Sequence, residues 1–167
     1  MIAKSYILRD LTTIGFLYRQ STSIKRGLFY SKLAILELCG WIEESMDDII
    51  LTCANRHLKN PANLKLVEKS IIGRTYGFEY EKHFRNMLIQ LIGTINLERI
   101  EYNFDPVKFQ VLKAQLNALK AIRDTEAHTH LKGITKRLDA PSVTKGRFPD
   151  IYNGLTDIDT NIRNFRF

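Results

Sequence analysis

The sequence predicts an all-α protein, a bundle of five to six helices of the kind built from long antiparallel members. Apolar residues recur at spacings of three and four along most of the chain, as on the buried face of a helix. A capping residue followed by proline, typical of a helix start, occurs at Asn60-Pro61 and Asp105-Pro106. No segment alternates between apolar and polar residues as a strand would. With 167 residues the chain is long enough to bury its own core, and we expect one domain over residues 1–167.

The first two helices are expected at residues 2–18 and 24–55. Gly40, in the middle of the second, costs up to about 1 kcal/mol relative to alanine, and so indicates a close helix approach or a slight bend. The apolar face of the first comprises Tyr6, Ile7, Leu11, Ile14, Leu17 and Tyr18. That of the second includes Leu28, Phe29, Leu33, Leu36, Trp41, Met46, Ile49, Ile50 and Cys53. Carboxylates on the second helix are expected to face solvent: Glu37, Glu43, Glu44, Asp47 and Asp48.

Three further helical segments follow, at residues 62–72, 78–100 and 106–130, and a last helix is expected at residues 149–165. Residues 133–149 contain two glycines and two prolines and keep no apolar period, which predicts a loop. The helix at 78–100 carries the apolar residues Phe84, Leu88, Leu91, Ile92 and Ile95. The helix that begins after Asp105 has a core-facing stripe of Phe109, Leu112, Leu116, Leu119 and Ile122.

Composition narrows the class of protein. The formal charge of +7 permits an anionic partner such as nucleic acid, but no lysine-arginine block supports a purely electrostatic DNA coat. No apolar run reaches the roughly 18 residues that a membrane span needs, and the first residues do not form a signal peptide.

Cys39 and Cys53 lie about 20 Å apart along one predicted helix, too far to form a disulfide. We expect buried free thiols in a reducing cytoplasm, with no support for structural zinc or another cofactor.

Titratable side chains cluster where the apolar stripe of the 106–130 helix ends. Arg123, Asp124, Glu126, His128 and His130 fall within eight residues. In a continuous helix Asp124 and His128 are four apart and share a face, so the carboxylate can orient the imidazole. A guanidinium beside them lowers the histidine pKa and can clamp a phosphate. A base, an acid and a fixed cation are the groups that phosphodiester cleavage uses.

The run Arg123-Asp124-Thr125-Glu126-Ala127-His128 resembles the signature of the HEPN superfamily, an arginine and a histidine separated by four to six residues. Its setting, after the long helix containing Leu-Ala-Ile-Leu-Glu-Leu-Cys-Gly-Trp-Ile-Glu at residues 33–43, is similar to HEPN domains of the RiboL-PSP type. The resemblance implies a compact helical bundle that dimerises around a shared cleft, with metal-independent ribonuclease activity. It implies Arg123 and His128 as the catalytic pair, with Asp124 as the polar neighbour. His130 also fits the spacing. His128 is favoured because Ala127 directly precedes it and because Asp124 lies on the same helix face as His128.

Other residues are weaker candidates. Glu126, His130 and Glu37 are possible supporting residues, and Glu43 could also face the cleft. Trp41, Phe29 and Leu33 are expected in the core or a dimer interface rather than stacked on bases. His57 is expected to complement the helix dipole, His83 to lie at the surface, and no histidine pattern predicts a metal site. The basic residues after the motif are expected to contact RNA phosphates: Lys132, Lys136 and Arg137.

The resemblance, added to the residue pattern, implies a cytoplasmic endoribonuclease of a toxin–antitoxin or antiviral defence system. It would act as a homodimer on RNA, without a cofactor, by attack of the ribose 2′-hydroxyl on the adjacent phosphate, and an antitoxin or other operon protein would be a partner. The alternative is a non-catalytic partner-binding or sensor module of a defence operon. A DNA-binding bundle is a third interpretation, although no predicted helix carries a basic, base-reading face.

Overall fold

The computed structural model describes residues 2–128 and 138–166, which are helical with no strand among them. The prediction of an all-α helical bundle is confirmed. Within these ranges there are seven α-helices: α1 (Ser5–Arg19), α2 (Ile24–His57), α3 (Pro61–Leu66), α4 (Arg85–Ile92), α5 (Thr94–Glu101), α6 (Pro106–His128) and α7 (Pro141–Asn164). Short π-helical and 3-10 segments, Val67–Ile71, Ile72–Arg74 and Tyr80–Phe84, join α3 to α4. No helix of this described part is long and apolar enough to cross a membrane.

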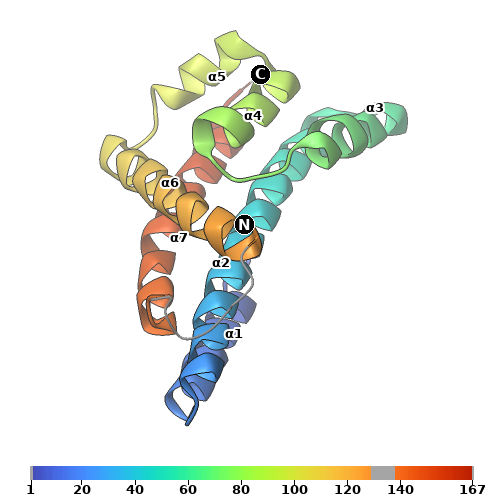
Figure 1. Ribbon diagram of the computed structural model, residues 1–167. Helices are drawn as coiled ribbons and strands as arrows, with labels where there is room; N and C mark the ends of the chain where they lie inside the picture. Colours follow the sequence, from blue (N-terminus) through green and yellow to red (C-terminus); the bar gives the residue numbers. More distant parts are fainter. Residues whose placement is uncertain (1, 129–137, 167) are drawn as a thin grey trace.

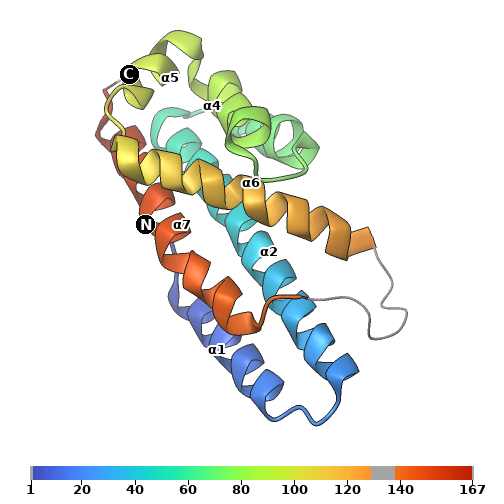
Figure 2. The same cartoon turned by 60° about the vertical axis from the view of Figure 1, so that its left-hand side comes forward.

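The long helices α1, α2 and α7 lie side by side, and α6 crosses α2 and α7 (Figures 1 and 2). The shorter helices α4 and α5 lie at the end of the molecule where the C-terminus is found (Figure 2). The C-terminal end of α6 therefore projects across the middle of α2, which places the motif beside the centre of the longest helix.

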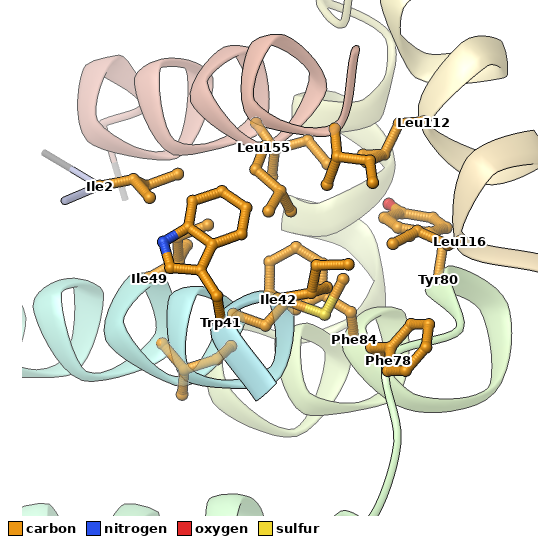
Figure 3. Packing of buried hydrophobic residues seen from close by; sticks show 14 of the residues in the cluster. Ile2, Trp41, Ile42, Ile49, Phe78, Tyr80, Phe84, Leu112, Leu116 and Leu155 are labelled. Carbon is orange, nitrogen blue, oxygen red and sulfur yellow. The ribbon is translucent and has the colours of Figure 1, made fainter. Parts of the chain in front are cut away.

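The core is centred on Trp41 of α2. Its ring lies 4.9 Å from the ring of Phe148, centroid to centroid, and its Nε1–H donates to the carbonyl oxygen of Ala3 at 2.8 Å. The indole is thus buried with its polar atom satisfied, and it ties the chain segment before α1 to α2 and α7. Figure 3 shows Ile2 and Leu155 on either side of this ring and the aromatic residues Phe78, Tyr80 and Phe84 farther along the same core.

Both cysteines are buried free thiols, as expected. The two predicted N-caps are also confirmed. The side chain of Asn60 accepts a hydrogen bond from the N–H of Ala62, and Asp105 Oδ1 accepts from the N–H groups of Val107 and Lys108. The latter bonds stabilise the carboxylate form and lower the pKa of Asp105.

The loop predicted at residues 133–149 is wrong from Pro141 onward, because α7 begins there and continues through Pro149. Proline is tolerated in the first turn of a helix, where Pro141 lies, whereas Pro149 is an interior proline and is exposed to solvent. An apolar stripe holds the helix together in spite of the hydrogen bond lost at Pro149. Its members recur every three or four residues: Pro141, Thr144, Phe148, Ile151, Leu155, Ile158 and Ile162.

The single helix predicted at residues 78–100 is also wrong. Gly93 adopts φ +80°, which breaks the chain into α4 and α5 because L-residues rarely occupy that region. The break turns Ile95 outward, so that it is 73% exposed instead of packing inward as expected.

Two expectations for α2 left alternatives open, and the structure removes one alternative from each. Phe29 and Leu33 are exposed, so they do not belong to the core, and their place in a dimer interface stays a prediction; Trp41 is in the core as expected. A Cβ added at Gly40 would meet no atom within 4 Å, so this glycine marks no close helix contact. The close approach occurs elsewhere, where Gly154 of α7 faces Leu112 of α6.

Candidate functional site

Helix α6 continues without a break from its Asp105 cap to His128. Its stripe Leu112, Leu116 and Leu119 is fully buried against the core, with Phe109 and Ile122 partly buried beside it, as the spacing predicted. The stripe fixes the rotation of the helix about its axis, and so determines where residues 123 and 124 emerge.

Arg123 is the centre of the site. Its Nη2 donates to Oε1 of Glu43 on α2, and its Nη1 donates to Oδ1 of Asp124 at 3.3 Å. The guanidinium carbon lies 5.4 Å from the centroid of the Phe78 ring, which is fully buried. The Arg123 side chain is 25% exposed. A cation held by two carboxylates and an aromatic ring, with part of its surface open, is ordered before any ligand binds.

Asp124 continues the network toward the segment before α4. Its Oδ2 accepts from Nζ of Lys120 at 2.6 Å, and this ammonium also lies 3.7 Å from Oε2 of Glu79. The hydrogen bond to Asp124 raises the pKa of Lys120. Glu79 in turn lies 3.8 Å from Nδ1 of His83. Cations and carboxylates thus alternate from α2 across α6 to residues 79–83.

His83 is therefore not the surface residue that was expected. Its side chain is 21% exposed. The imidazole packs over Gly77, where an added Cβ would lie 2.7 Å from Cε1, and Gly77 has φ +133°. Because glycine alone offers both the backbone conformation and the space, His83 fastens the turn that carries Phe78 and Glu79.

Burial dominates the electrostatics of the neighbouring part of α2. It raises the pKa of the Cys39 thiol to about 12, while the positive charge of Arg123 acts in the opposite direction. Burial, with the charges of Glu43, Asp48 and Glu44, raises the pKa of Asp47 to about 6. The α2 carboxylates therefore do not all face solvent, contrary to expectation, and Cys39 stays a neutral thiol near neutral pH.

The predicted site residues have different outcomes. Arg123 and Asp124 come together, whereas Glu37 is exposed and Glu43 occupies the supporting position. Glu126 is buried, 2% exposed, in the body of the bundle. His128 belongs to α6, and the structure does not describe its side chain. The remaining candidates lie outside the described residues: His130, Lys132, Lys136 and Arg137.

Sequence reasoning missed Lys120, Glu79 and Phe78 as parts of the site. The only local signal was the spacing of four between Lys120 and Asp124, which permits an ion pair on one helix face. The predicted contact between Asp124 and His128 rests on the same spacing of four residues, counted from Asp124 toward the C-terminus. No spacing rule could bring residues 78–83 to the motif, because they come from a different helical segment.

A second cationic feature lies between α1 and the first turns of α7. A hollow of about 320 Å³ there is lined by Arg19 and Lys145, and Nζ of Lys145 donates to Oγ1 of Thr12 at 2.8 Å. A neighbouring hollow of about 360 Å³ shares Tyr18 and Arg19 with it. Among the residues that the structure describes, no carboxylate lines either hollow, and both present hydroxyl groups and positive charge.

In the described ranges, no three histidine, cysteine, aspartate or glutamate side chains lie together as a metal site would require. Comparison with known proteins gave no match: no family model, no curated protein and no solved structure is similar to the chain.

Proposed function

We propose that the protein is a metal-independent endoribonuclease of the HEPN type. The observation that carries the proposal is the ordered guanidinium of Arg123 on a helix that continues to His128. Five residues along one helix correspond to about 7.5 Å of rise and about 140° of rotation. A cation and an imidazole at that separation can address one phosphodiester group, the cation binding its oxygens while the imidazole exchanges a proton with the ribose 2′-hydroxyl.

In this mechanism the 2′-hydroxyl oxygen attacks the adjacent phosphorus and the bond to the 5′-oxygen of the next nucleotide breaks. His128 accepts the hydroxyl proton or donates one to the leaving oxygen. Arg123 stabilises the charge that develops on the non-bridging oxygens. The products are a 2′,3′-cyclic phosphate end and a 5′-hydroxyl end, and no metal enters the reaction.

The test incubates purified protein with RNA in excess EDTA and identifies the product ends by mass spectrometry. We expect cleavage by the wild type and losses of about 100-fold or more for Arg123→Ala and His128→Ala. Arg99→Ala serves as the control, since it removes one positive charge from the exposed surface of α5. Cleavage that requires a divalent metal, or that survives both substitutions in the motif, would refute the mechanism.

The RNA partner is further supported by the hollows around Arg19, whose described lining offers hydroxyl groups and positive charge to the phosphates of a bound strand. A homodimer is supported by the exposed apolar side chains Phe29 and Leu33 on α2. Sedimentation equilibrium of the wild type and of Phe29→Ser/Leu33→Ser tests the dimer, and a wild-type monomer at micromolar concentration would contradict it.

The second candidate function is a non-catalytic partner-binding module of a defence or toxin–antitoxin operon. The engagement of Arg123 by Glu43 and Asp124 favours it, because a guanidinium so held can serve as a structural or interface residue. This function predicts a stable complex with the product of a neighbouring gene and no growth inhibition on expression. Growth inhibition by the wild type but not by His128→Ala would favour the nuclease instead.

A further inference from the structure

Both terminal nitrogens of Arg123 are already occupied by carboxylate oxygens, one from Glu43 and one from Asp124. These two nitrogens form the fork with which an arginine binds two oxygens of a phosphate. A phosphate that binds both terminal nitrogens competes with the two carboxylates for this position. We propose that Glu43 occupies the phosphate position of Arg123 in the free protein, and that RNA binds there by displacing it. The inference rests on the proposed function and defines how its substrate is bound.

The two carboxylates differ in how firmly they are held. Asp124 adjoins Arg123 in α6, and Lys120 of the same helix donates to it at 2.6 Å. Contacts within α6 therefore hold the Asp124 carboxylate in place. Glu43 comes from α2, its side chain is 37% exposed, and its one hydrogen-bond partner among residues 2–126 and 138–166 is Arg123. A glutamate with a single partner and an open side can rotate into water, where its charge is solvated. Glu43 is therefore the carboxylate that a phosphate replaces.

The guanidinium itself does not need to move during the exchange. Phe78 lies beneath it at 5.4 Å and is fully buried, and Asp124 continues to hold Nη1. Arg123 therefore stays over the Phe78 ring when Glu43 leaves, because the buried ring and Asp124 hold the guanidinium in place. The incoming phosphate replaces one anionic contact of Arg123 with another, so the guanidinium keeps two anionic partners. A ligand therefore binds to Arg123 only if it competes successfully with the carboxylate of Glu43.

The experiment measures binding separately from cleavage. A fluorescent single-stranded RNA with 2′-O-methyl riboses carries the phosphates but lacks the attacking hydroxyl, and its dissociation constant is measured by anisotropy at low salt. The test variant is Glu43→Gln, which keeps the size of the side chain and removes its charge. The matched control is Glu44→Gln on the adjacent residue, which removes the same charge but accepts a hydrogen bond from Tyr6 instead of Arg123.

We expect Glu43→Gln to bind this RNA about two- to five-fold more tightly than the wild type, from the usual strength of a partly exposed ion pair. Glu44→Gln should change affinity less, and the gain should vanish in the Arg123→Ala background. Equal effects of the two glutamine variants, weaker binding by Glu43→Gln, or no binding by any of the proteins would overturn the inference.

The cleavage assay with ordinary RNA distinguishes failure of this inference from failure of the proposed function. Tighter binding by Glu43→Gln without cleavage of RNA would support the displacement of Glu43 and refute the proposed nuclease activity. Cleavage that depends on Arg123 and His128, together with unchanged RNA affinity of Glu43→Gln, would support the nuclease activity and refute the displacement of Glu43. Thermal melting of each variant verifies that it is folded, and the comparison of Glu43→Gln with Glu44→Gln stands even if Arg123→Ala is unstable.

Discussion

The contact between α6 and α7 makes one alanine substitution informative. Replacing an interior helix glycine by alanine usually stabilises a protein by up to about 1 kcal/mol. Gly154 should behave in the opposite way, because its added Cβ would lie 2.6 Å from Leu112 Cβ and 3.1 Å from Leu112 Cγ. Gly146 belongs to the same helix, and a Cβ there meets no atom within 4 Å. The same chemical change should therefore have opposite effects at two positions of α7.

The magnitude follows from the geometry. Carbon atoms in contact prefer about 3.5–4.0 Å, so 2.6 Å is about 1 Å too close. The nearest atom, Leu112 Cβ, is attached to the backbone of a fully buried residue, and no rotamer change can move it. Relief requires α6 and α7 to shift, at a cost near the upper part of the roughly 1–3 kcal/mol seen for overpacking. After the helix-propensity gain, Gly154→Ala should lose about 1–2 kcal/mol of unfolding free energy.

Urea unfolding followed by far-ultraviolet circular dichroism measures the effect. Gly146→Ala should gain up to about 1 kcal/mol, which places the two variants about 1–3 kcal/mol apart. A Leu112→Ala background should not rescue Gly154→Ala, because alanine keeps the offending Cβ. Equal stabilisation by the two glycine substitutions would refute the close packing of α6 on α7.

Three further predictions concern other parts of the molecule. Gly77→Ala should destabilise the protein by about 1–3 kcal/mol, since it combines a φ of +133° with a contact of 2.7 Å to His83, and an unchanged urea midpoint would contradict this. The pKa of Asp47 is raised to about 6 from an ordinary 3.8, so ionisation disfavours the folded state and its stability contribution declines as pH rises through about 6. Asp47→Asn should therefore raise the unfolding free energy near neutral pH relative to the wild type and change it little near pH 4, and equal effects at both pH values would argue against it. Burial raises the thiol pKa of both Cys39 and Cys53, so neither should react promptly with Ellman's reagent until denaturant is added, and fast reaction of the folded protein would be inconsistent with their burial.

Features that depend on neighbours along the chain could be predicted from the sequence. The stripe Leu112, Leu116 and Leu119, the caps Asn60 and Asp105, and the burial of the two cysteines follow from spacing and local hydrogen bonding. Each is determined within about one helical turn, where residues three and four apart share a face. The same rules identified Arg123 and Asp124 as a cluster at the end of a packed helix.

Tertiary structure decided which partners these residues have. Glu43 is 80 positions from Arg123, and Glu37 on the same helix was an equally acceptable candidate until the crossing of α2 and α6 selected between them. Lys120 binds Asp124 within α6, and the approach of Glu79 from another segment gives this ammonium a second carboxylate.

The extent of α7 was decided in the same way. Local rules placed a loop at Pro149, but burial of Phe148 against Trp41 stabilises helix on both sides of that proline. Sequence spacing determines which residues of one helix lie on a common face. Only the packing of one helix on another determines what each face meets, because that contact joins residues with no fixed separation along the chain.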